Sequence, residues 1–290
     1  MPTTNDNNKL ANNASLVETD SSQANSTTAS TISNQRQLLS LAHQFGIDGA
    51  ISAAEQSIPI FERASRREQQ LKVRQQKNLE NILHKAVAYS SNEKVTDKID
   101  VDWFFQFTEL ASSVSNSIMQ SLWAKILAGE VEKPGAFSLK ALHIFKQLSM
   151  HDAKLFAKAC SLSAKNTQSS TRRIITGCYQ PPALKNFFNN TKQLIKLGDF
   201  GLNYTNILTL ANNNLLFKQE AELSVLRAEN LVLDYQNQPL TFSFKKANGV
   251  LTFIKFTAIG NELAQLIEPN PQPAYHAILL QTCNHLFDVK

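Results

Sequence analysis

The sequence predicts an α+β fold, predominantly α-helical, in which a helical domain precedes a winged-helix-like domain with a small antiparallel sheet. Two observations carry this prediction. From residue 35 to about residue 165, apolar residues recur every three or four positions, as in amphipathic helices. Beyond residue 213 apolar and polar residues alternate, which is typical of half-buried strands. We predict a disordered tail over 1–34, a helical domain over 35–165 and the winged-helix-like domain over 170–290.

The first 34 residues consist mainly of Asn, Ser and Thr. Such a segment buries too little apolar area to offset the entropy of ordering, so we expect it to be disordered. It contains one lysine, Lys9, and no apolar block, so it does not resemble a signal peptide. No apolar run in the chain approaches the roughly 18–20 residues that cross a bilayer. The three cysteines are far apart and odd in number, as expected of free thiols in a reducing compartment. We therefore expect a cytoplasmic protein without membrane attachment.

A long helix is predicted from about Ile60 to Tyr89. Its ends are amphipathic, whereas its middle is basic, with Glu68 as the single acid between residues 65 and 78. Most basic helical faces are simply solvated. Contact with nucleic acid or with an acidic partner is the other interpretation, although the stretch lacks interleaved aromatic residues that would stack on bases. The candidate contact residues here are Arg66, Arg67, Lys72 and Arg74.

Cap residues divide the rest of the helical domain. Asp100 is a predicted N-cap, and the small polar run over 112–117 is expected to kink or break the helix that follows. The next helix should end at Gly129 in a left-handed cap. Ser138 and Ser149 then open two further helices, the second with a capping box.

The C-terminal third mixes helices and strands. We expect strands over 172–179, 223–226, 231–235, 240–244 and 250–256, and helices ending near Leu197, over 204–211, over 257–267 and at the C-terminus through Phe287. Turns are expected over 236–239 and 246–249, and Asn248-Gly249 is the strongest hairpin signal in the chain. This order suggests a winged helix with residues 204–211 in the recognition-helix position. Lys245 and Lys246 would lie near the tip of its wing.

No catalytic constellation is recognisable. The chain has no glycine-rich phosphate loop and no zinc-ligand spacing, so no cofactor or metal is expected. Cys283 and His285 are poorly spaced as a ligand pair, and Asp100 is explained as a cap. Glu130 and Glu132 are interpreted as polar loop residues just past a helix end.

The most distinctive segment runs from Gln120 to Glu130. Its apolar residues form one broad face, and both tryptophans, Trp103 and Trp123, are predicted to belong to the core. Together with Asp100-Val-Asp-Trp-Phe and Pro134-Gly-Ala-Phe-Ser-Leu-Lys-Ala-Leu, this segment resembles an uncharacterised bacterial family, one of the domains of unknown function. The resemblance is specific over about 98–160 and looser in the C-terminal third. It implies a bacterial cytoplasmic protein and brings no catalytic residue.

Three functions remain open. The leading hypothesis is a non-catalytic binding or regulatory protein that acts through protein contacts. The alternative is DNA binding by the winged-helix-like domain. The segment 204–211 has no Lys or Arg, so Asn206 and Thr209 would read bases while other residues contact phosphates. Those phosphate contacts would come from Lys192, Lys196, Lys245 and Lys246. An enzyme with a dispersed site is the third hypothesis.

Overall fold

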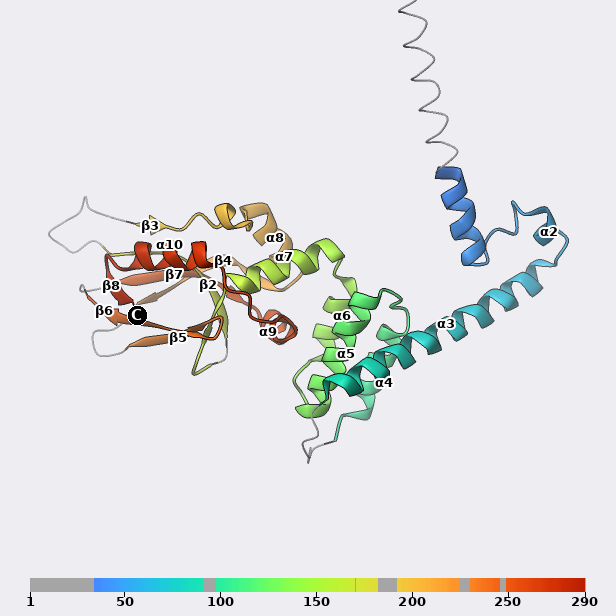
Figure 1. The fold of residues 1–290 in the computed structure, drawn as a ribbon, viewed down its shortest axis with the longest axis horizontal. Coiled ribbons are helices and arrows are strands. Elements are labelled where there is room, and N and C mark those ends of the chain that lie inside the picture. Colours follow the sequence, from blue (N-terminus) through green and yellow to red (C-terminus); the bar gives the residue numbers. More distant parts are fainter. Residues whose placement is uncertain are drawn as a thin grey trace, which may run out of the picture. The chain divides into compact units, whose positions relative to one another are not determined.

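The computed structural model describes residues 34–90, 98–169, 171–181, 192–224, 230–245 and 249–289 (Figure 1). Contacts between residues divide the chain into two units, residues 1–76 and 77–290. The tail predicted over 1–34 lies, except for Asn34, outside the described residues. The predicted domain boundary between residues 165 and 170 stays a prediction.

The N-terminal unit contains a helix over 34–44, α2 (Ala53–Gln56) and the first half of α3 (Ile60–Tyr89). The bounds of α3 are as predicted. Among the described residues of this unit only Gly49 is buried. The described part of this unit, residues 34–76, therefore shows no hydrophobic core of its own.

The C-terminal unit opens with the end of α3 and four capped helices. These are α4 (Val101–Ala111), α5 (Ser117–Glu132), α6 (Leu139–Gln147) and α7 (Met150–Ser161). The side chains of Asp100, Asn116, Ser138 and Ser149 each accept a backbone N–H at the start of their helix, and Ser149 forms a capping box with Asp152. The predicted caps and the predicted break before α5 are confirmed.

Trp123 lies at the centre of the helical core. It is fully buried, with its ring centroid 5.4 Å from that of Phe107 and 5.3 Å from that of Phe145. Trp103 is also buried, and its Nε1 donates a hydrogen bond of 2.7 Å to the carbonyl of Phe137. Both tryptophans therefore belong to the core, as predicted.

The end of α5 differs from the prediction. The helix continues past Gly129 to Glu132, so Gly129 is not a left-handed cap. A Cβ on Gly129 would lie 3.0 Å from Cε2 of Phe137, so glycine is needed here for close packing. Glu130 is buried rather than in a loop, and its carboxylate accepts the N–H groups of Gly135 and Phe137 at 2.7 and 2.9 Å. Glu130 thereby holds the turn that leads to α6.

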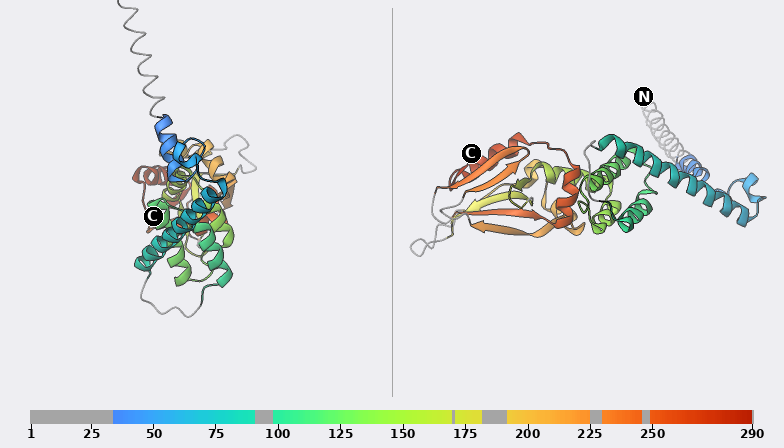
Figure 2. Two further views of the ribbon diagram at one scale, coloured as in Figure 1. Left: turned by 90° about the vertical axis from the view of Figure 1, so that its right-hand side faces the viewer. Right: turned by 90° about the horizontal axis from the view of Figure 1, so that it is seen from below.

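The strands form one antiparallel sheet (Figure 2). They are β1 (Ala164–Asn166), β2 (Arg172–Tyr179), β3 (Gln193–Leu194), β4 (Leu216–Ser224), β5 (Leu231–Tyr235), β6 (Gln238–Phe244), β7 (Val250–Phe256) and β8 (Phe287–Val289). The order is β4-β7-β2-β1-β5-β6-β8, and β3 pairs with β2. The remaining elements are η1 (Leu197–Phe200), α8 (Tyr204–Asn212), α9 (Ala258–Leu263), η2 (Ala264–Leu266) and α10 (Pro273–Cys283).

Helices α7 and α10 both pack against this sheet. The Tyr275 hydroxyl on α10 donates to the carbonyl of Ile175 at 2.9 Å, and its ring lies 5.9 Å from that of Tyr235 on β5. The ring centroid of Phe156 on α7 lies 5.9 Å from that of Phe256 on β7. The three cysteines are buried free thiols, consistent with their interpretation from sequence.

The hairpin predicted at Asn248-Gly249 is wrong. β6 pairs with β5 and β8, whereas β7 pairs with β2 and β4, so the two strands are not neighbours. β7 is buried at six of its seven positions, which places it between two strands rather than at an edge. A tight hairpin lies at Gln236-Asn237, within the turn predicted over 236–239, where φ is 53° and 69° between β5 and β6.

Other predicted elements also change. Residues 193–194 are a strand rather than the end of a helix, and residues 182–191 lie outside the described part. β4 starts at Leu216 instead of 223, and Phe287 belongs to β8, where it pairs with β6, rather than to the last helix. An α+β fold with an antiparallel sheet is confirmed. The sheet has eight strands and is not small, and a winged-helix-like domain is not confirmed.

Candidate binding site

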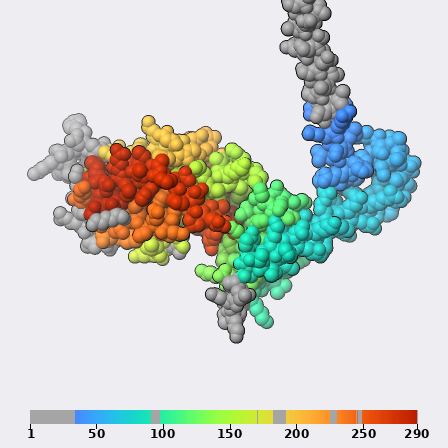
Figure 3. Space-filling model, in the orientation of Figure 1, coloured from blue at the N-terminus to red at the C-terminus, as the bar shows by residue number. Residues whose placement is uncertain are grey.

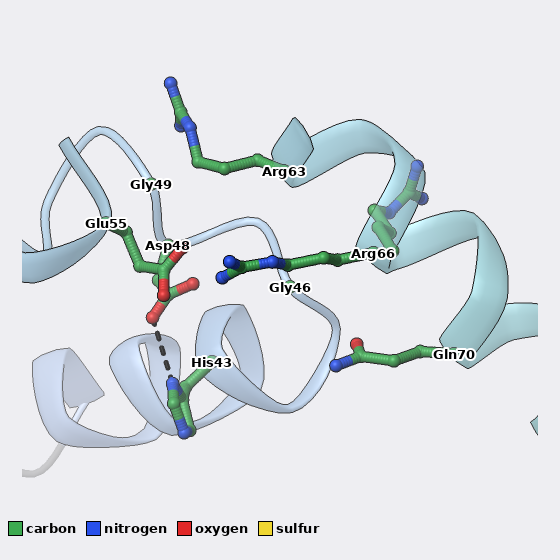
Figure 4. A pocket seen from close by; sticks show the side chains of 9 residues that line it. His43, Gly46, Asp48, Gly49, Glu55, Arg63, Arg66 and Gln70 are labelled. Atoms are coloured by element: carbon green, nitrogen blue, oxygen red, sulfur yellow. Dashed lines mark hydrogen bonds and ion pairs between the residues drawn. The ribbon is translucent and has the colours of Figure 1, made fainter. Parts of the chain in front are cut away.

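The basic stretch of α3 lines a small pocket of about 130 Å³ in the N-terminal unit (Figure 4). One wall is α3, and the other is the loop that follows helix 34–44. The residues around the pocket are His43, Gly46, Asp48, Gly49, Glu55, Arg63, Arg66, Arg67 and Gln70. Three guanidinium groups thus come from one helix, because Arg66 and Arg67 lie three or four residues from both Arg63 and Gln70.

Arg63 is held in place by backbone. Its Nε donates a hydrogen bond of 3.1 Å to the carbonyl of Ile58. A Cβ on Gly49 would lie 1.8 Å from Nη1 of Arg63, so only glycine lets the guanidinium approach this close to the loop. Gly46, with φ of 62°, forms the turn that precedes this loop.

The loop side of the pocket carries acidic groups. Nδ1 of His43 lies 3.0 Å from Oδ2 of Asp48, the contact that is dashed in Figure 4. This hydrogen bond lowers the pKa of the Asp48 carboxyl, which therefore stays ionised at neutral pH. The pocket consequently pairs a fixed carboxylate with an excess of guanidinium groups.

The structure brings together some of the predicted basic residues and not others. Arg66 and Arg67 both line the pocket, and Arg66 also forms an exposed ion pair of 2.7 Å with Glu62. Lys72 does not line it and pairs with Glu68 at 2.8 Å. Arg74 lies over the ring of Phe45, 4.4 Å from its centroid, and donates to the carbonyl of Gln44.

Large apolar side chains of the same unit are exposed. This surface belongs to the blue segments of the space-filling view (Figure 3). The exposed side chains are Leu38, Leu39, Leu41, Phe45, Ile47, Ile51, Ile60, Phe61 and Val73, and Phe61 reaches 83% exposure. Large apolar side chains that are exposed in this way can mark an interaction site.

The lysines that the DNA hypothesis assigns to phosphate contacts are not gathered in one site, and two of them have partners in the C-terminal unit. Lys192 pairs with Glu220 of β4 at 3.3 Å, and Lys245 donates to the carbonyl of Asn284 at 3.1 Å. Lys196 is exposed before η1, and Lys246 lies outside the described residues.

The two side chains expected to read bases form hydrogen bonds with nearby backbone. Nδ2 of Asn206 donates to the carbonyl of Gly201 at 3.2 Å. Oγ1 of Thr209 donates to the carbonyl of Thr205 at 3.0 Å. Thr209 can donate to a base only by losing this bond, whereas the amide group of Asn206 keeps a second N–H donor.

A second hollow, of about 720 Å³, lies beside the distinctive segment of α5. Lys125, Ala128, Gly129 and Phe137 contribute to its wall. Nζ of Lys125 already pairs with Glu268 at 2.8 Å. The segment from Gln120 to Glu130 thus packs into the core on one side and lines an open pocket on the other.

Sequence reasoning missed Arg63 and Gln70 in the first pocket. The signal was available, because both lie at helical spacing from Arg66 and Arg67. The acidic side could not be found in this way, since Asp48 lies in the loop after helix 34–44 and Glu55 lies on α2.

Among the described residues, no cluster of three or more His, Cys, Asp or Glu side chains could hold a metal ion. No helix within the described ranges has both the length and the apolarity needed to cross a bilayer. No curated protein and no solved structure matches the chain. A family model described as "Protein of unknown function (DUF2806)" matches residues 62–280, three quarters of the chain. The chain therefore belongs to the DUF2806 family.

Proposed function

We propose that this chain is a non-catalytic binding protein whose N-terminal unit recognises an acidic segment of a protein partner. The observation that carries the proposal is the arginine-lined pocket in a unit whose large apolar side chains are exposed. Arginine and aromatic residues are enriched at protein interfaces. On the resemblance described above, we place this function in the bacterial cytoplasm.

The charges of the pocket support an acidic ligand. Arg67 forms no ion pair with a described carboxylate, and the partner of Arg66 is the exposed Glu62. An exposed pair of this kind is weak, so a competing carboxylate can replace Glu62 at little cost. A guanidinium binds a carboxylate through two parallel hydrogen bonds, which favours aspartate and glutamate side chains.

The exposed apolar side chains support a protein rather than a small anion. The described residues of the unit form no core that buries them, so a partner that covers them would gain the free energy of removing apolar area from water. The acidic side chains of the partner would then fix its register by pairing with the arginines of the pocket.

A peptide titration tests the proposal. The probe is a fluorescent peptide that alternates glutamate with leucine, and the readout is its anisotropy as the full chain is added. We expect the double variant Arg66→Glu, Arg67→Glu to weaken binding by at least tenfold, because it reverses two charges at the pocket. Lys72→Glu is the matched control, since it changes charge on the same helix outside the pocket. Equal losses in the two variants would contradict the proposal.

The DNA alternative is tested with the same chain. In it, a winged-helix-like C-terminal part contacts phosphates through Lys192, Lys196, Lys245 and Lys246. Random duplex DNA should then bind with an affinity that falls steeply with salt, and Lys245→Glu with Lys246→Glu should weaken it. Tight duplex binding that is insensitive to the Arg66 and Arg67 changes would favour this alternative over the protein partner.

A further inference from the structure

One arginine of the sheet is buried without a partner for its charge. Arg173 lies on β2 and is 8% exposed. Its Nε is buried without a hydrogen-bond partner, and within the described ranges no carboxylate forms an ion pair with it. Burial lowers the pKa of the guanidinium, which nevertheless remains charged at neutral pH. A buried charge without a counter-charge is destabilising and therefore needs an explanation.

A second cation faces the first. In the register of the β2–β7 ladder Arg173 lies directly opposite Lys255, which is exposed. On its other side Arg173 pairs with Ala164 of β1. Directly opposed residues of antiparallel strands share a face, and like charges in this position weaken a sheet. The ladder thus concentrates positive charge at one place on one face.

Phe253 orients the guanidinium. It lies two residues before Lys255 on the same face, and its ring centroid is 4.8 Å from Cζ of Arg173. An arginine over an aromatic ring uses the flat face of the guanidinium for that contact, so its N–H donors remain available at the edge. Those donors match the two oxygens of a carboxylate or a phosphate.

We propose that Arg173 and Lys255 form an oxyanion-binding site on this face of the sheet, for a carboxylate or phosphate group. Arg173 would donate two hydrogen bonds, and the flexible Lys255 ammonium would add a second positive charge. The site belongs to the C-terminal unit and does not depend on the function proposed for the N-terminal unit. Arg172 provides the contrast, because Nη1 of Arg172 lies 3.4 Å from Oγ of Ser163 and so has a partner.

Thermal unfolding of the full chain tests the site. The probes are inorganic phosphate and, separately, glutarate, each compared with chloride at equal ionic strength. Ligand at ten times its Kd should raise the Tm of the wild type by about 3–6 °C. Arg173→Met should lose this rise, yet unfold at a higher temperature than the wild type in chloride, because an unpaired buried charge is replaced by an apolar side chain. Lys255→Met should reduce the rise, and the control Arg172→Met should keep it.

The contrary results are equally clear. A wild type that responds to neither anion would overturn the site, and so would an equal response in Arg173→Met. If Arg173→Met does not fold, the exposed change Lys255→Met and the charge-retaining change Arg173→Lys decide, since unchanged responses in both contradict the proposal. The anion with the larger effect identifies the chemistry of the ligand. The double variant at Arg66 and Arg67 should retain the response, which separates this site from the peptide-binding pocket.

Discussion

At the scale of single residues, the two tryptophans differ in how their indole N–H groups are satisfied. Nε1 of Trp103 donates to the carbonyl of Phe137, whereas Nε1 of Trp123 is buried without a hydrogen-bond partner among the described residues. Trp103→Phe should therefore lower the free energy of unfolding by about 1–3 kcal/mol beyond the lost packing, because a carbonyl is left unpaired. Trp123→Phe removes a donor that has no partner, so it should lower the free energy of unfolding by less than Trp103→Phe does. Urea denaturation of both variants checks the difference, and equal costs would contradict it.

Gly129 offers a second test at this scale. Alanine has the higher helix propensity by about 1 kcal/mol. Its Cβ would, however, lie 3.0 Å from Cε2 of Phe137, whose backbone is held by Trp103 and Glu130. Because Phe137 is buried and fixed on both sides, we expect overpacking to dominate and Gly129→Ala to destabilise the protein by about 1–2 kcal/mol. The double variant with Phe137→Leu should recover part of the loss, as chemical denaturation would measure.

At the scale of elements, the Gln236-Asn237 turn joins β5 to its neighbour β6. Both residues have positive φ, but only Gln236 is anchored by its side chain. Its amide donates to the carbonyls of Cys160 and Ser163 at 2.7 and 3.1 Å and accepts the N–H of Asn270 at 2.9 Å. The turn thus joins the β5–β6 hairpin to the end of α7 and to the segment before α10.

Two glycine substitutions separate conformation from anchoring in this turn. Asn237→Gly should be neutral or stabilising by up to about 1 kcal/mol, because glycine adopts positive φ without strain. Gln236→Gly gains the same freedom but loses three hydrogen bonds, so we expect a net loss of about 2–4 kcal/mol. Thermal unfolding of the pair measures this contrast. Equal effects at the two positions would mean that the side-chain bonds of Gln236 contribute nothing.

At the scale of the whole molecule, burial is distributed unequally between the two units. The buried apolar residues form a cluster from Ile82 to Val289, whereas no apolar side chain is buried among the described residues of the N-terminal unit. Amides of helix 34–44 should therefore exchange with deuterium through local opening that costs almost no free energy. Amides of α5 around Trp123 should approach the free energy of global unfolding. Hydrogen exchange followed by mass spectrometry checks this order, and the acidic peptide should raise protection in the N-terminal unit only.

The candidate pocket was predictable where it depends on one helix. Arg66 and Arg67 were identified from sequence because they belong to the basic stretch of the predicted long helix. Arg63 follows from helical spacing, although its close approach to Gly49 is tertiary. The acidic wall and the buried Arg173 were not predictable. A charge on a strand indicates neither what covers it nor which residue lies opposite.

The sequence by itself determined the local structure of this protein. It determined the helix over 60–89, the caps at Asp100, Ser138 and Ser149, the strand over 172–179 and the absence of a recognisable catalytic motif. These features depend on periodicity and on hydrogen bonds between near neighbours in the chain. Tertiary structure alone decided that β7 lies between β4 and β2, that Phe287 enters a strand and that Glu130 is buried. Each depends on residues distant in sequence, and their competition for partners, rather than the Asn248-Gly249 pair, selected the hairpin.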